Sequence, residues 1–440
     1  MSFGRNIVLK KQDIKGISRA SLNRFWQLRA MVLVSMLVES HVAFAQQSIL
    51  TEPADVAGNR SQPDYDPMGL ELGSFLLRPT LSISPDFNSN VFTQEDHPES
   101  DASLTITPTI TATLRIPGQA FAATAQMKAR RYASFNGQND EQYRLEASGF
   151  AELPESITLT TNVGWSESTA SRGSFENNLQ IGPPLKKRDF NSSIFLKKQF
   201  NRLSIDGAFT ASKFSYEDVR LDSGVTIDQS FRDGHRVGGR VGVAYGVSPL
   251  LSFQVKGSYD SFDYNEPRSL FNRDADGYSL TVGMRYELTR LLVAEIDAGL
   301  RRHKFKNAAF PDIEGLALSS NLRWYPTPLV SVRMDLGQST TTSSFDAVSA
   351  VTVTNFKLSS DYEYRRNIVL SGEIQGALEE YQGINAEAKL ISITGRADWK
   401  LNRLLALRGH CTFNVRTGSG SPLVPSYNAL KAGVSVILAI

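Results

Sequence analysis

Hydrophobic and polar residues alternate with a period of two along most of the chain beyond residue 74. The alternation is clearest at the end of the chain, where every second residue is small or apolar, namely Leu430, Ala432, Val434, Val436, Leu438 and Ile440. The same pattern fills residues 251–260 and 278–288. Because successive side chains of a strand point to opposite faces, these segments predict strands with one apolar and one polar face, as in membrane β-strands.

Tight turns and long polar connections alternate between these segments. The tight turns fall at residues 115–119, 153–155, 200–202, 247–250, 288–290, 325–328, 365–367 and 401–403. The long connections fall at residues 86–101, 166–187, 216–231, 263–275, 304–314, 338–350 and 416–427, with shorter ones near 137 and 384. A soluble sandwich also alternates its faces, but short turns at one end and long loops at the other are typical of outer-membrane barrels.

The turns set the expected number of strands. Eight tight turns join sixteen strands, and strands near 75–85 and 428–440 raise the number to about eighteen. Sixteen stays possible because residues 102–115 and 188–198 alternate poorly. We therefore predict an all-β fold for residues 74–440, a transmembrane antiparallel up-and-down β-barrel with short periplasmic turns, long extracellular loops and both termini in the periplasm.

The first part of the sequence has the order of a targeting segment. Seven basic residues lie before residue 30, a short apolar stretch follows at residues 31–38, and Ala43-Phe-Ala45 provides a small-x-small cleavage site. This order predicts a secretory signal peptide at residues 1–45. A retained helical anchor is the alternative, but the apolar stretch before Glu39 is too short to span a bilayer. Residues 46–73 are rich in Pro, Asp, Asn and Gln, which predicts a flexible periplasmic leader.

The amino-acid composition excludes several other classes of protein and of site. Hydrophobic residues are 41% and charged residues 21% of the chain, which is too polar for a bundle of membrane helices. The net charge of +2 leaves no electrostatic footprint for nucleic acid. A single cysteine, Cys411, excludes an intramolecular disulfide framework and a multi-cysteine metal site. It reads as a small apolar wall residue.

Three features resemble catalytic or ligand-binding motifs, but each matches its motif only in part. His410 could be half of a Ser–His pair in a barrel hydrolase, or a structural histidine in the lumen, which we favour. Asp86-x-Asn88-x-Asn90 imitates the start of a calcium loop but lacks its glycine and closing glutamate. The run Gly238–Gly242 precedes no helix, so it is not a phosphate-binding loop. We predict no catalytic, metal-binding or cofactor-binding residues and no enzyme activity.

The polar register predicts the lining of the lumen. If the apolar face meets lipid, the polar face of the well-alternating strands carries Arg285, Arg323, Arg333, Lys357, Arg396 and Arg408, and the same register adds Arg365. Such charges need water or ion-pair partners. A barrel this wide is not filled by its own side chains, so loops 166–187 and 216–231 are candidates for an inward constriction.

Aromatic residues recur near the predicted strand ends, which is typical of interfacial girdles. They include Trp165, Tyr216, Phe305, Trp324, Tyr364, Tyr381 and Trp399.

The last strand resembles a known sorting signal. Lys431-x-Gly433-x-x-Val436-x-Leu438 is similar to the polar-x-Gly-x-x-apolar-x-apolar pattern that hands bacterial barrels to the outer-membrane assembly machinery. The chain ends in Ile440, where that pattern has an aromatic residue. The resemblance implies outer-membrane lipid and the barrel assembly machinery as partners.

The first hairpin resembles a known family. The segment Leu77–Phe92, followed by Ser103–Ile110 with its Pro-x-apolar step, is similar to the opening hairpin of the Putative beta-barrel porin 2 family. The resemblance implies an exopolysaccharide-associated barrel in the cell outer membrane, a passive conduit for a polysaccharide chain that works with a periplasmic polysaccharide export protein. A general diffusion porin for small solutes and a structural or adhesive surface barrel are the alternatives.

Overall fold

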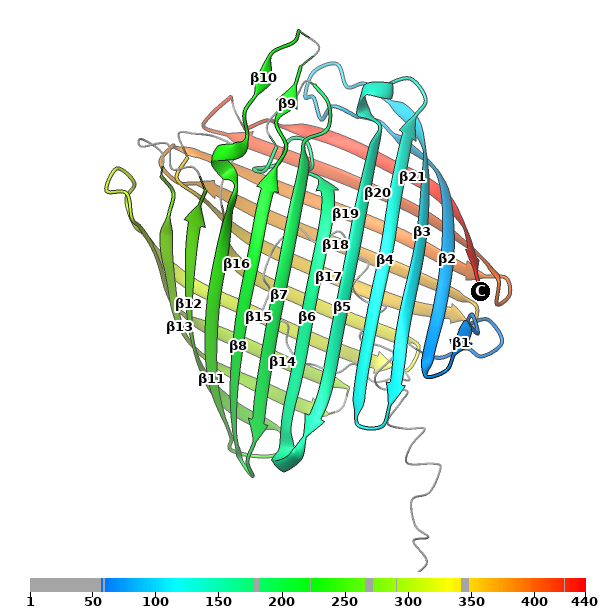
Figure 1. Cartoon of the computed structure of the whole chain (residues 1–440), viewed down its shortest axis with the longest axis vertical. Helices are drawn as coiled ribbons and strands as arrows, with labels where there is room; N and C mark the ends of the chain where they lie inside the picture. The colour runs from blue at the N-terminus through cyan, green and yellow to red at the C-terminus, as the bar shows by residue number, and fades with distance from the viewer. Residues whose placement is uncertain are drawn as a thin grey trace, which may run out of the picture.

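The computed structural model describes residue 57 and residues 60–440, except 178–181, 222, 266–271, 290, 342–347 and 423. The expected signal peptide, residues 1–45, lies outside the described residues. Most of the chain forms long antiparallel strands that slant around a hollow wall (Figure 1). No helix in the described ranges is long and apolar enough to cross a membrane.

Eighteen strands form the wall. They are β2 (Phe75–Asn88), β3 (Asp101–Ile116), β4 (Gln119–Tyr132), β5 (Asp140–Leu153), β6 (Ile157–Thr169), β7 (Lys186–Gln199), β8 (Leu203–Tyr216), β11 (Gly234–Gly246), β12 (Leu251–Tyr264), β13 (Ala275–Thr289), β14 (Leu292–Phe305), β15 (Ile313–Thr327), β16 (Val330–Thr341), β17 (Val351–Arg365), β18 (Ile368–Tyr381), β19 (Ala386–Lys400), β20 (Leu405–Ser419) and β21 (Tyr427–Ala439).

Each wall strand pairs with its neighbours in the chain, and the first pairs with the last. The closing pair joins β2 to β21, with Leu81 opposite Leu438 and Asp86 opposite Gly433. The short strand β1 (Leu70–Leu72) extends the sheet beside the start of β2, and β9 (Val219–Arg220) pairs with β10 (Thr226–Ile227) in a ribbon above the wall (Figure 1). Eighteen strands are present because the poorly alternating β3 and β7 both pair along their full length.

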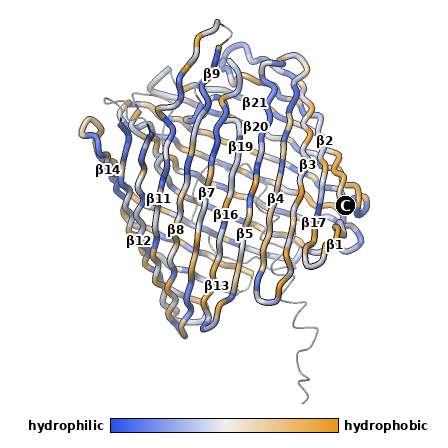
Figure 2. Tube along the Cα trace, in the orientation of Figure 1, coloured by the Kyte–Doolittle hydropathy of each residue, from blue (hydrophilic) through white to orange (hydrophobic). Residues whose placement is uncertain are grey.

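The outer surface of the wall is apolar. Along the strands, hydrophobic and hydrophilic positions alternate (Figure 2), and the hydrophobic set points outward. Leu280 and Leu300 face each other across β13 and β14 and remain 62% and 68% exposed. A soluble sandwich would bury this face in a core, so the exposure excludes that alternative and matches a surface solvated by lipid.

The two ends of the barrel differ in the length of their connections. Neighbouring strands are joined by tight turns at one end, which lies at the bottom of Figure 1, and by longer connections at the other. We refer to them as the turn end and the loop end. The number of wall strands is even, so the first and last wall strands both have their outer termini at the turn end.

Candidate functional site: the barrel lumen and its loop-covered mouth

The six basic residues predicted for the lumen all lie on the inward register, and each is paired with a carboxylate. The pairs are Arg285–Glu287, Arg323–Asp335, Arg333–Asp361, Lys357–Glu373, Arg396–Asp398 and Arg408–Asp398. Representative distances are 3.1 Å from Arg323 to Asp335 and 2.8 Å from Lys357 to Glu373. Apart from Asp361, which is buried, these side chains are partly exposed, so water screens the pairs and their contribution to stability is small. The pairing makes this wall close to neutral rather than positively charged.

A buried ion-pair network on the wall joins β12 and β14. The Lys256 ammonium lies 2.7 Å from Glu295 and 2.9 Å from Asp297. The Lys256 side chain is 9% exposed and that of Asp297 is 3% exposed. Gln254 donates hydrogen bonds to the same two carboxylates. The alternation placed Lys256 inward, but its importance depends on partners from a strand 39 residues away in the chain.

Aspartates lie flat against inward-facing glycines of the neighbouring strand at four places. A Cβ atom on Gly238 would lie 2.2 Å from an Asp260 carboxylate oxygen, and one on Gly242 would lie 2.5 Å from Asp206. The remaining two glycine–aspartate contacts are Gly283 with Asp297 and Gly433 with Asp86. The first two aspartates pair with arginines of β11. The glycine run at 238–242 therefore provides room for carboxylates on the lumen wall.

A different inner surface lies on β3 and the adjoining part of β4. Six successive inward positions in the middle of β3 are hydroxylated, namely Ser103, Thr105, Thr107, Thr109, Thr111 and Thr113. Gln126 of β4 donates a hydrogen bond of 3.1 Å to Thr109, and the Thr111 and Thr124 hydroxyls lie 3.3 Å apart. We call this column the threonine face. It offers many neutral donors and acceptors and contrasts with the ion pairs on the opposite wall.

The connection between β6 and β7 crosses the mouth at the loop end. Phe175 of this loop packs against an apolar cluster on the far wall, formed by Val348, Val351, Val353, Tyr381, Ala386, Ala388 and Val424. These residues belong to β17, β18, β19, the connection before β17 and the connection between β20 and β21, whereas β6 lies in the front wall (Figure 1). The loop therefore spans the lumen, as expected for residues 166–187, although β6 and β7 extend further than predicted and shorten the loop.

Both sides of the crossing loop are held by polar contacts. On one side the Arg172 guanidinium donates a hydrogen bond of 2.7 Å to Gln138 and lies over the Phe92 ring. Burial lowers the pKa of the Arg172 guanidinium. On the other side Glu176 accepts a hydrogen bond of 2.8 Å from Lys187 at the base of β7. These contacts, and the tight fit of Gly173 against Tyr427, fix the loop across the mouth.

The second predicted constriction, loop 216–231, also folds toward the crossing loop at its base. The guanidinium of Arg232, fully buried, lies 3.6 Å from the centroid of the Tyr216 ring. The Tyr216 hydroxyl is 3.4 Å from Glu176 of the crossing loop. The strands β9 and β10 rise away from this base (Figure 1). Val219 of β9 and Ile227 of β10 nevertheless pack in one cluster with Ala170 and Leu185, at the two ends of the crossing loop.

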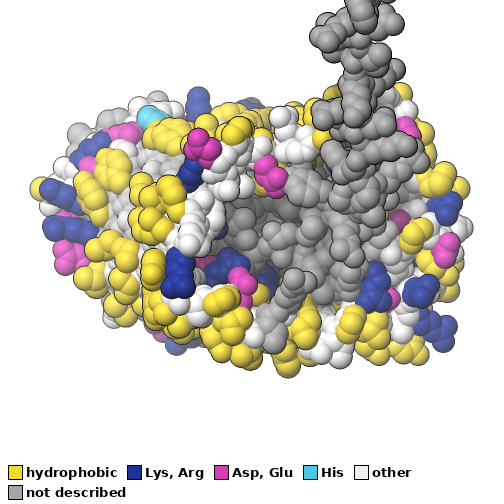
Figure 3. Space-filling view, turned by 90° about the horizontal axis from the view of Figure 1, so that it is seen from below, with side chains coloured by type: hydrophobic (Ala, Val, Ile, Leu, Met, Phe, Trp, Pro, Cys, Tyr) yellow, Lys and Arg dark blue, Asp and Glu magenta, His cyan; other side chains and the backbone are white. Residues whose placement is uncertain are grey.

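At the turn end, the described part of the expected leader lies along the rim. Ser331 donates a hydrogen bond to the carbonyl of Ala57, and both residues are fully buried. Arg60 lies 3.6 Å from Glu363, and Asp66 lies 2.6 Å from Lys400. The segment thus follows the strand ends from β16 to β20. Seen from this end, hydrophobic side chains surround the outside of the barrel (Figure 3).

The residues with weak motifs occupy structural positions. Nε2 of His410 lies 3.4 Å from an Asp86 oxygen, and Asp86 also accepts hydrogen bonds from Ser84 and Thr105. Asn90 instead donates to the carbonyls of Gln94 and Asn428 in the loop above. Asp86 and Asn90 therefore bind different partners. Cys411 is exposed on the outer face of β20.

Two sequence predictions about orientation are wrong. Arg365 does not follow the inward register, because the strand pairing shifts between Glu363 and Arg365 and leaves this arginine exposed at the turn. Tyr216, Phe305 and Tyr381, which we expected in the outer girdles, are 4–7% exposed and lie under the loops. Trp324, Tyr364 and Trp399 are exposed, as girdle residues should be.

A closed antiparallel barrel with a lipid-solvated outer face and a polar, ion-paired lumen defines an outer-membrane β-barrel of the porin type. The chain belongs to the Putative beta-barrel porin 2 family, whose model matches residues 62–438. In outer-membrane barrels generally, the end with short turns faces the periplasm and the end with long loops faces the cell exterior.

Several solved outer-membrane barrels are similar to the chain at low identity and low TM-score. The BenF-like porin of Pseudomonas fluorescens Pf-5 is 11% identical, with 84% of this chain and 100% of that chain covered and a TM-score of 0.45. OpdK of Pseudomonas aeruginosa, solved with vanillate, is 10% identical over 83% and 99%, with a TM-score of 0.39. The ferric enterobactin receptor PfeA of the same species is 9% identical over 83% and 80%, with a TM-score of 0.42. No curated protein matches the chain.

Proposed function

We propose that this barrel is a passive conduit for an exopolysaccharide chain crossing the outer membrane. The observation that carries the proposal is the inner surface, where the threonine face lies across from a wall of balanced ion pairs. Hydroxyls exchange hydrogen bonds with sugar hydroxyls at little cost, and a neutral wall creates no deep binding minimum for a moving chain. Barrels of sixteen to eighteen strands are wide enough to leave an aqueous channel.

Deleting the gene in its host tests this function. The proposal predicts that surface polysaccharide is lost while uptake of small solutes is unchanged, and that the wild-type gene restores the polysaccharide. The matched control is a strain complemented with Val241→Ala, since Val241 is 61% exposed on the lipid face and should restore export fully. Normal surface polysaccharide in the deletion strain would contradict the proposal.

A general diffusion porin for small solutes is the second candidate. The crossing loop favours it, because a loop folded across the mouth narrows the passage. The deletion strain separates the two functions, since a diffusion porin predicts reduced solute uptake with surface polysaccharide intact.

We also propose the expected export and assembly steps. A signal peptide cleaved after Ala45 predicts a mature protein that begins at Gln46, which N-terminal sequencing of purified protein reads directly. The C-terminal pattern of Lys431, Gly433, Val436, Leu438 and Ile440 would be read by the barrel assembly machinery. Removing Ile440 should then slow folding into membranes in cells, while replacing it with Phe should preserve or accelerate it. A periplasmic polysaccharide export protein is the proposed partner at the turn end, and cross-linking in cells tests that contact.

A further inference from the structure

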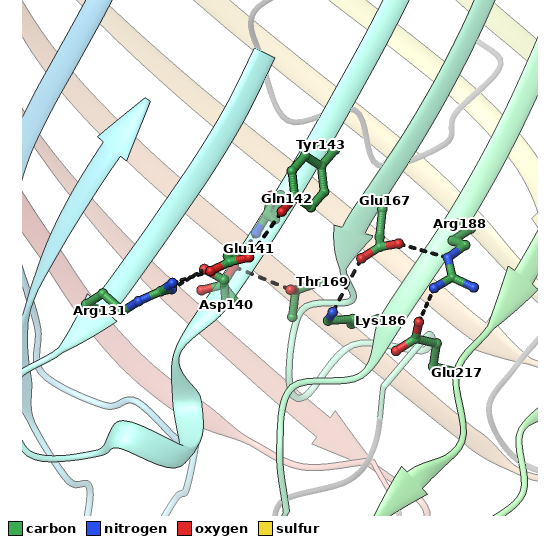
Figure 4. Close-up of polar contacts among 10 residues, drawn as sticks. All are labelled: Arg131, Asp140, Glu141, Gln142, Tyr143, Glu167, Thr169, Lys186, Arg188 and Glu217. Carbon is green, nitrogen blue, oxygen red and sulfur yellow. Dashed lines mark hydrogen bonds and ion pairs between the residues drawn. The ribbon is translucent and has the colours of Figure 1, made fainter. Parts of the chain in front are cut away.

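Several cations on the outer surface near the loop end are matched by carboxylates. Arg131 pairs with Glu141 on neighbouring strands (Figure 4). Arg188 is bound by Glu167 at 2.8 Å and by Glu217 (Figure 4). The same pairing continues around the wall with Arg302–Asp312 at 2.6 Å, Arg302–Glu314 at 3.3 Å and Lys306–Asp263 at 2.6 Å. The protein therefore neutralises these cations of its outer edge with its own acids.

The turn end has a different arrangement. Arg365 and Arg366 lie on the turn between β17 and β18, and Arg403 lies on the turn between β19 and β20. All three are exposed, and among the described residues none of them forms an ion pair with a carboxylate. Arg403 donates a hydrogen bond of 2.8 Å to the carbonyl of Pro63, and the Arg365 guanidinium lies over the Tyr364 ring. We call these three residues the arginine rim.

The arginine rim lies where the apolar outer surface ends. Tyr364 is 53% exposed, Trp399 45% and Leu404 60%, and all three point outward at the turn end. Trp399 pairs with Ile368 and Leu407, so it lies on the strand between the two arginine-bearing turns. Exposed aromatic and aliphatic side chains at a strand end mark the boundary between hydrocarbon and headgroups. The guanidinium groups therefore lie at the depth of the lipid headgroups.

We propose that the arginine rim binds the phosphate groups of anionic phospholipids in the periplasmic leaflet. A guanidinium presents several donors in one plane and binds phosphate through two parallel hydrogen bonds. At this boundary the three cations have no acid from the described chain to pair with, and anionic headgroups supply that charge. Cations that already have a carboxylate partner, such as Arg188 at the loop end and Lys198 beside Glu155 at the turn end, have no such requirement. The preference therefore belongs to the arginine rim.

Quenching of Trp399 by brominated lipids tests the proposal. Trp26, Trp165 and Trp324 are replaced by Phe in the full chain, and the protein is placed in vesicles of phosphatidylcholine with increasing brominated phosphatidylglycerol or brominated phosphatidylcholine. We expect phosphatidylglycerol to bind beside Trp399 about fivefold more tightly for each arginine that contacts it. Arg365→Gln, Arg366→Gln and Arg403→Gln together should reduce the ratio to about one.

Two controls separate this result from general effects. Arg131→Gln with Arg302→Gln removes two cations at the loop end and should leave the ratio at Trp399 unchanged. The single substitution Arg366→Gln, at an exposed position, should already lower the ratio if the triple variant folds poorly. Equal quenching by the two lipids in the parent protein, or an unchanged ratio after Arg366→Gln and after the triple change, would overturn the proposal and leave the rim available to an acidic protein partner.

Discussion

Replacing Phe175 with alanine should release the loop that crosses the mouth. Phe175 is the apolar contact between this loop and the cluster around Val351 and Tyr381 on the far wall. The ring is partly buried, so its removal costs about 1.5 kcal/mol, the lower end of the range for a buried phenylalanine. Since each 1.4 kcal/mol changes an equilibrium about tenfold, the ratio of released to docked loop should rise roughly tenfold. The contacts of Arg172 and Glu176 remain, so the loop should still redock.

Single-channel recording in planar bilayers measures this equilibrium. We expect Phe175→Ala to spend roughly ten times longer in its high-conductance state, relative to the low-conductance state, than the wild-type protein. The matched control is Phe190→Ala, which removes the same ring from a position 44% exposed on the outer wall, and its traces should match wild type. If the traces of Phe175→Ala were the same as those of Phe190→Ala, the loop would not limit the passage and the reasoning would fail.

Two further substitutions test the wall by urea unfolding in lipid vesicles. Gly238→Ala places a methyl group against the carboxylate of Asp260 and should destabilise the barrel by about 1–3 kcal/mol. The control Gly337→Ala, at an inward position with open space around it, should have little effect. Equal losses of stability in the two variants would refute the idea that Gly238 makes room for the Asp260 side chain. Lys256→Leu leaves the buried Asp297 without its cation and should cost about 3 kcal/mol; a loss below about 1 kcal/mol would show that water already screens this pair.

The strands could be predicted because alternation is a local property of the sequence. The apolar face of residues 278–288 leaves only one orientation in which lipid meets hydrophobic side chains, and the structure confirms it through the exposure of Leu280 and Val282. The same register predicts that the six basic residues line the lumen, and each of them lies beside a carboxylate in the structure. Even the weakly patterned β3 is paired throughout, because threonine is favoured in strands and its hydroxyl suits a polar lumen.

The remaining features depend on residues far apart in the chain. The contact of Asp260 with Gly238 requires that β11 and β12 pair in one particular register. The docking of Phe175 depends on strands that follow it in the chain by some two hundred residues. The error at Tyr381 has a similar origin, since a residue at a strand end can face lipid or lie beneath loops. The arginines of the rim were visible in the turns, but their lack of acidic partners required the fold.

The most direct test of a glycan conduit is efflux of a fluorescent neutral glucan chain from vesicles that contain the protein. The account predicts slow efflux through the wild-type barrel, faster efflux through Phe175→Ala, and none through empty vesicles. Small solutes should leave through both barrels in every case. Passage of small solutes with retention of the glucan by Phe175→Ala, and by a variant lacking residues 171–177, would contradict the account and identify the barrel as a diffusion porin.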